Sequence, residues 1–81
     1  MKIYVAIHHD GYADVTETVR AFTTREQAIK WKADIARKDW PVSNLGEIPD
    51  DQDVLIDTYW DYMDCHGFAW FFWDECEVEY G

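Results

Sequence analysis

The first segment with a regular hydrophobic pattern is Lys2 to His9. Its odd positions hold the β-branched apolar residues Ile3, Val5 and Ile7. A period of two is typical of a β-strand with one buried face. Asp10-Gly11 follows as a hairpin signal, because glycine tolerates the positive φ that a tight turn requires. Val15 to Phe22 alternates again, so we predict a second strand, antiparallel to the first.

The next segment has the signals of a helix. Thr23 and Glu26 fit a capping box, in which each side chain bonds the backbone N–H of the other residue. The residues that then recur at helical spacing are Ala28, Trp31, Lys32 and Ile35. We predict a helix from about Thr24 to Lys38, whose last basic residues lie near its negative end. Trp40 to Pro49 is rich in turn formers and is predicted to be irregular.

Asp53 to Asp64 fits two structures. As a helix it would be capped at Asp50, and one face would carry Leu55, Tyr59, Tyr62 and Met63. As a strand it would use its many β-branched and aromatic residues, which are enriched in strands. This content favours the strand, and Cys65-His66-Gly67 would then form a hairpin turn.

Phe68 to Tyr80 is the clearest strand. The residues expected on its buried face are Phe68, Trp70, Phe72, Cys76, Val78 and Tyr80, interrupted by Asp74. Phe71 and Trp73 share the opposite, acidic face with Glu75 and are expected at the surface. The element order ββαββ predicts an α+β fold, an antiparallel sheet of about four strands with one helix packed on one face.

The length of 81 residues predicts a single domain over residues 1–81. Five Trp, five Tyr and four Phe can supply a small core without disulfides. Cys65 and Cys76, in a chain whose start does not resemble a signal peptide, favour reduced thiols and a cytoplasmic location in a host cell. No run approaches the ~20 apolar residues of a membrane span, so no membrane partner is expected.

Charge is distributed unevenly along the chain. The net charge is −10, and all seven Lys and Arg residues lie in the first 38 positions, where six carboxylates nearly balance them. From Glu47 onward there are eleven carboxylates and no Lys or Arg. A phosphate backbone would be repelled by this half of the chain, so direct nucleic-acid binding is disfavoured and a basic partner is expected.

The acidic residues of the last strand suggest a function. Glu75, Glu77 and Glu79 would form a row at intervals of roughly 6.6 to 6.8 Å, with Asp57 and Asp61 on the neighbouring strand. Such a surface resembles the phosphate charge of a duplex. The alternative is a solvated face that keeps an aromatic-rich protein soluble. The excess of like charge, which destabilises a compact state, favours the functional interpretation.

Metal binding and catalysis have little support in the sequence. Asp50-Asp51-Gln52-Asp53 offers carboxylates but lacks the glycine and glutamate that an EF-hand loop requires. The His and Cys residues lack the spacing of a zinc site. No phosphate loop, nucleophile elbow or zincin motif is present. We therefore expect a binding protein with no cofactor or metal, and not an enzyme.

The opening KIYVA, the FTTREQA segment and the acidic tail are similar to short proteins of bacteriophages and mobile elements. The acidic members resemble anti-CRISPR and anti-restriction inhibitors that imitate DNA. This resemblance implies an inhibitor that occludes a basic nucleic-acid channel of a host defence complex, such as a CRISPR interference complex. The partner-binding residues that we predict are Asp57, Asp61, Asp64, Trp73, Asp74, Glu75, Glu77 and Glu79. An acidic adaptor without DNA mimicry and a small metal-buffering protein are the alternatives.

Overall fold

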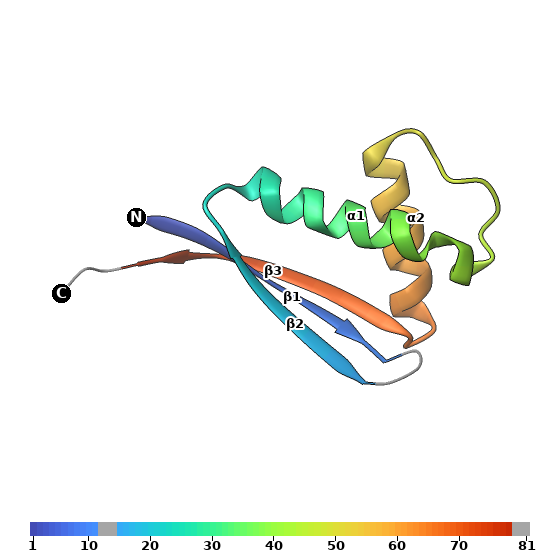
Figure 1. Cartoon of the computed structure of the whole chain (residues 1–81), viewed down its shortest axis with the longest axis horizontal. Coiled ribbons are helices and arrows are strands. Elements are labelled where there is room, and N and C mark those ends of the chain that lie inside the picture. The colour runs from blue at the N-terminus through green and yellow to red at the C-terminus, as the bar shows by residue number, and fades with distance from the viewer. Residues whose placement is uncertain (12–14, 79–81) are drawn as a thin grey trace.

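The protein is a two-layer arrangement of one sheet and two helices, described by a computed structural model for residues 1–11 and 15–78. The strands are β1 (Lys2–Asp10), β2 (Thr16–Phe22) and β3 (Ala69–Glu77), and the helices are α1 (Arg25–Ser43) and α2 (Gln52–Cys65). The molecule measures 49 × 29 × 18 Å, and both helices lie on the same side of the sheet (Figure 1). The α+β class and the antiparallel sheet are confirmed, whereas four strands and one helix are wrong.

The sheet has the strand order β2-β1-β3, with β1 in the centre. β1 and β2 pair antiparallel from Tyr4↔Phe22 to Asp10↔Thr16, which confirms the first predicted hairpin. Residues 12–14 of its connection lie outside the described residues. β3 pairs antiparallel with the other edge of β1, so α1 and α2 form the crossover between the two outer strands.

The helices cover the face of the sheet that carries the even-numbered residues of β1. Ala6 is fully buried there, and the His8 ring contacts Trp31 of α1 and Trp60 of α2. Residues directly across a ladder share a face, so the odd-numbered residues of β3 lie on the helix side. We call the other side, with the odd residues of β1 and β2 and the even residues of β3, the open face.

The prediction for the two faces of β3 is therefore wrong. Phe71 and Trp73, expected at the surface, are half-buried against the helices. Trp70 and Phe72, expected inside, are 39% and 56% exposed on the open face. Aromatic residues on both faces of the strand made the period uninformative. Ala69, a small residue on the helix side of β3, is buried beneath the helices.

α1 is displaced and longer than predicted. Its capping box joins Thr24 and Gln27, one residue after the predicted Thr23 and Glu26 pair. The helix continues to Ser43 with Pro41 in its last turn, so the first part of the segment predicted to be irregular is helical. Buried Trp40 fixes this extension, because its indole N–H donates to the Gly46 carbonyl at 2.8 Å.

α2 occupies the segment that we predicted to be a strand. The Asp51 carboxylate caps it by accepting hydrogen bonds from the backbone N–H groups of Asp53 and Val54, at 2.9 and 3.1 Å. Its buried residues follow a helical spacing: Leu55, Ile56, Tyr59, Trp60 and Met63. Burial of this face outweighs the strand propensity of the segment. Cys65 to Gly67 accordingly ends a helix and does not form a hairpin turn.

An aromatic cluster of His8, Trp31, Trp60 and Phe71 joins the two layers. The Phe71 ring centroid lies 5.2 Å from that of Trp31 and 5.5 Å from that of Trp60. His8 meets both indole rings edge to face. The Trp60 N–H donates to the Lys32 carbonyl at 3.2 Å, which also ties α2 to α1. This cluster fixes both helices on one face of the sheet.

Replacement of His8 by phenylalanine tests whether the cluster requires a neutral imidazole. Burial lowers the pKa of His8 from its usual 6.5, although Asp10 and Asp39 oppose the shift. The folded state therefore binds fewer protons at His8 than the unfolded chain does. The contribution of the neutral His8 ring to the free energy of unfolding is complete above pH 6.5 and is lost as the pH falls below it. Phenylalanine cannot take up a proton, so only the wild type should lose this stability in acid. The free energy of unfolding of His8→Phe, minus that of the wild type, should therefore increase as the pH is lowered from about 7.5 to about 5.5, as measured by urea titrations. An equal difference at both pH values would contradict this assignment.

Candidate functional site

One side of α2 carries a stripe of four exposed carboxylates. We define this acidic stripe as Asp53, Asp57, Asp61 and Asp64, which follow one another at intervals of four, four and three residues. At ~100° per residue these positions fall within ~80° of the helix circumference. The predicted site residues Asp57, Asp61 and Asp64 are thus brought together, on a helix and not on a strand. Asp53 was not among the predicted partner-binding residues, and only the helical period aligns Asp64 with the other three carboxylates.

The axial spacing of the carboxylates in the acidic stripe can be compared with the spacing of phosphates along a nucleic-acid strand. A rise of ~1.5 Å per residue separates successive carboxylates by ~4.5 to 6 Å along the helix axis. A DNA strand carries one phosphate charge for each ~3.4 Å of axial rise. The stripe therefore has somewhat more than half the linear charge density of a single DNA strand.

The stripe is only weakly compensated by cations. The ion pairs of the described residues involve none of its four carboxylates. Lys32 of α1 is the nearby cation, and Asp57 and Asp61 favour its charged form. Burial nevertheless lowers the pKa of Lys32 overall, and its ammonium lies 5.6 Å from the centre of the Phe71 ring. Lys32 is thus held against the core beside the stripe.

The acidic end of β3 has a different environment. Glu75 forms an ion pair with Lys2 at 2.9 Å, and Glu77 pairs with the amino group of Met1 at 3.0 Å. Both pairs are exposed and follow from the antiparallel register of β1 and β3. Glu79 lies outside the described residues. Glu75 and Glu77 thus lie on one face of β3, as predicted, but each already has a cation.

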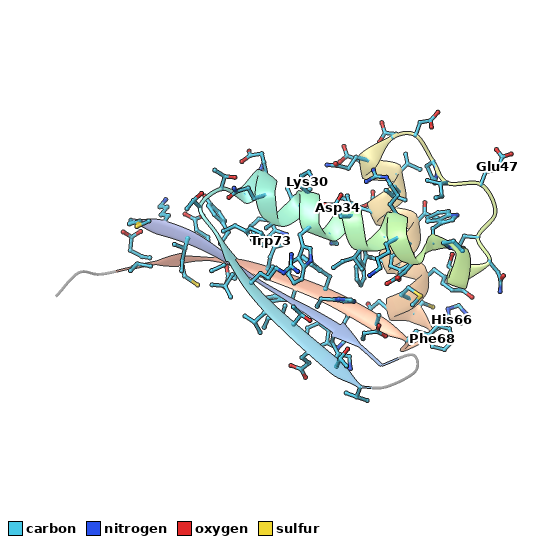
Figure 2. The ribbon with its side chains drawn as sticks, in the orientation of Figure 1. Lys30, Asp34, Glu47, His66, Phe68 and Trp73 are labelled. Carbon is cyan, nitrogen blue, oxygen red and sulfur yellow. The ribbon has the colours of Figure 1, made fainter. Side chains whose placement is uncertain are left out.

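The two remaining predicted residues lie on opposite faces of β3. Trp73 is half-buried on the side of the sheet that faces α1 (Figure 2), with its ring 6.1 Å from that of Tyr4. It belongs to the edge of the core, so its predicted role as an exposed anchor is wrong. Asp74 is exposed on the open face. Neither residue joins the acidic stripe.

A groove of about 350 Å³ lies beside the stripe. Its lining residues are Lys32, Trp60, Asp61, Asp64, Trp70, Phe71 and Phe72. Two stripe carboxylates thus border a wall of aromatic side chains at the free edge of β3. Carboxylates next to aromatic faces suit lysine and arginine side chains, which ion-pair with the former and stack on the latter. Sequence reasoning did not select Trp70 and Phe72, because it placed them in the core.

Other chemistry finds no support in the described part of the chain. Among residues 1–11 and 15–78, no group of three or more His, Cys, Asp or Glu side chains could hold a metal ion. Cys65 and Cys76 are free thiols. No helix in these ranges has the length and apolar character needed to cross a membrane.

Comparison with known proteins gives no match for this chain among family models, curated proteins or solved structures.

Two single substitutions test whether the stripe is arranged for folding stability. Asp64 lies in the last turn of α2, where the helix dipole disfavours a negative charge, and Asp53 lies in the first turn, where it is favoured. Asp64→Asn should raise the free energy of unfolding by ~0.3 to 1 kcal/mol, and Asp53→Asn should lower it or leave it unchanged. Urea unfolding at low salt measures both changes, which should shrink at high salt. A loss of stability in Asp64→Asn would show that this carboxylate serves the fold.

Proposed function

We propose that the protein binds a basic, nucleic-acid-binding surface of another protein through the acidic stripe and so excludes nucleic acid from that surface. A host defence complex with a nucleic-acid channel, such as a CRISPR interference complex, is the kind of partner that we propose. The observation that supports this most directly is the line of exposed carboxylates along α2, none of which forms an ion pair with another described residue.

The energetic cost of the stripe supports a use for it. Like charges three or four residues apart destabilise a helix by about 0.2 to 0.5 kcal/mol per pair, and the stripe contains three such pairs in succession. No basic residue occupies the last turn of α2 to offset Asp61 and Asp64. The total penalty is ~1 kcal/mol, a substantial part of the stability of a small domain. Recognition of basic side chains gives this arrangement a function that folding does not require.

The groove adds a second kind of contact. Arginine or lysine side chains that pair with Asp61 and Asp64 would also lie against Phe71, which lines the same groove on the helix side of β3. Charge-assisted hydrogen bonds are stronger than neutral ones, and partly desolvated aromatic contacts add to them. The stripe would attract the partner, and the groove would hold its basic side chains.

We expect the acidic stripe of α2 and the acidic end of β3 to contribute unequally to binding. Glu75 and Glu77 must release Lys2 and the Met1 amino group before they bind another cation. The stripe carboxylates have no such pairs to break within the described residues. Binding energy should therefore come mainly from α2 and less from the end of β3.

A pull-down with two matched variants tests this function. The first variant carries Asp57→Asn and Asp61→Asn in the stripe, and the second carries Glu75→Gln and Glu77→Gln, so that each removes two negative charges. Immobilised wild-type protein should retain proteins from a bacterial lysate at low salt, and excess short duplex DNA should release them. The stripe variant should lose retention of these proteins by tenfold or more, while the β3 variant should lose much less, because Glu75 and Glu77 are already neutralised by Lys2 and the Met1 amino group. Mass spectrometry of the DNA-released fraction measures the difference.

Circular dichroism of both variants provides the control for folding. Equal losses from the two variants would contradict the assignment to α2. Retention that ignores DNA would contradict mimicry and would favour an acidic adaptor that binds protein without imitating nucleic acid.

A further inference from the structure

We propose that the open face of the sheet is a dimer interface, on which a second copy of the chain packs face to face. The open face is turned away from both helices (Figure 1). No element within the described ranges, 1–11 and 15–78, covers this face.

The centre of the open face is apolar. Ile7 of β1 is flanked by Val19 on β2 and Phe72 on β3, directly opposite in the ladder. Val19 is 61% exposed and Phe72 is 56% exposed. Single exposed apolar residues are common on proteins, but contiguous apolar patches bordered by polar residues mark interaction sites. This row across all three strands is such a patch.

Charged groups on the open face lie at its margins. Glu17 is on the outer strand β2, and its carboxylate is 3.4 Å from the imidazole of His9. Asp74 is on the opposite outer strand, β3. An apolar centre with a polar rim is the usual anatomy of a protein interface. The two carboxylates therefore flank the central apolar row and do not interrupt it.

The charge layout of the open face suits a second copy of the same chain. A two-fold axis between two packed sheets can run along the strands or across them. If the axis runs along the strands and is centred on Ile7, Glu17 lies opposite Trp70 of the second copy, and Asp74 lies opposite Ala21 of the second copy. If the axis runs across the strands through the same point, Glu17 lies opposite Ala21 of the second copy, and Asp74 lies opposite Trp70 of the second copy. Neither isologous arrangement sets a carboxylate against a carboxylate.

The remaining negative charge also favours this arrangement. A protein with a net charge of −10 resists self-association most strongly through a surface on which its carboxylates are concentrated. The acidic stripe lies in the helix layer, on α2. Two sheets that pack ~10 Å apart place both helix layers on the outside of the dimer, so the two stripes stay apart. The open face is thus the surface through which two copies can meet with little repulsion.

Sedimentation velocity from the micromolar to the millimolar range tests the interface. The wild type should change from one copy to two as concentration rises. Phe72→Lys and Val19→Lys should remain monomeric throughout, because each places a cation in the centre of the interface and both side chains are mainly exposed in one copy. Val54→Lys is the matched control, since Val54 is 50% exposed but lies on α2. It should dimerise like the wild type.

The two free cysteines give a second measurement on the unaltered wild-type protein. Cys76 lies on the open face opposite Ile3, and Cys65 is exposed at the end of α2. Alkylation of Cys76 should slow severalfold relative to that of Cys65 as concentration rises. In Phe72→Lys the ratio of the two rates should not depend on concentration.

A wild type that stays monomeric at millimolar concentration would overturn the proposal, as would a dimer that both lysine substitutions leave intact. Either result leaves the proposed function of the acidic stripe standing, because that function does not require two copies.

Discussion

The packing of two indole rings against one face of a three-stranded sheet is the interaction on which the rest of the structure depends. Trp31 and Trp60 come from different helices, yet both contact His8 in the central strand and Phe71 in an edge strand. In a chain of 81 residues the helices that these rings hold can cover only one side of the sheet. Burial of large aromatic rings is a major source of stability in a domain of this size, so the side that receives them becomes the core. The other side is left to solvent or to a partner.

The packing of the helices on one face of the sheet also determines which side of α2 exposes its aspartates. α2 must turn its buried residues, Leu55, Tyr59 and Trp60 among them, toward the sheet and α1. The aspartates at the remaining helical positions are then aligned on one exposed side. Lys32 is held beside them by its contact with Phe71, so the position of this cation next to the stripe also follows from the aromatic packing. The protein consequently presents an acidic surface on its helix layer and an apolar surface on its sheet.

The sequence predicted those parts of the fold that depend on neighbouring residues. The hairpin between β1 and β2, the start of α1 near Thr24 and the extended last segment required only local period and turn chemistry. The structure of residues 53–64 required tertiary information, because the segment satisfies the period of a strand and that of a helix. The face of β3 that is buried was equally undetermined, since Trp70 and Trp73 are both large and apolar. For the site, Asp57, Asp61 and Asp64 were predicted to share one acidic surface on a strand, and the structure aligns them on a helix. The ion pairs of Glu75 and Glu77 could not be foreseen, because they join residues at opposite ends of the chain.

The two exposed surfaces respond to salt with opposite sign, and this separates their roles. Screening weakens the attraction between the acidic stripe and a basic partner, because those charges are exposed and the Debye length shortens to ~3 Å at 1 M salt. The same screening reduces the repulsion between two copies of a chain with net charge −10, while burial of Val19, Ile7 and Phe72 is not an electrostatic contribution and persists. Contact through the open face should therefore strengthen under the conditions in which contact through α2 weakens. A dimer would in addition carry two stripes on a rigid frame, and two linked contacts raise the apparent affinity for a basic surface long enough to engage both. The apolar face of the sheet would then contribute to recognition at the acidic helix without touching the partner.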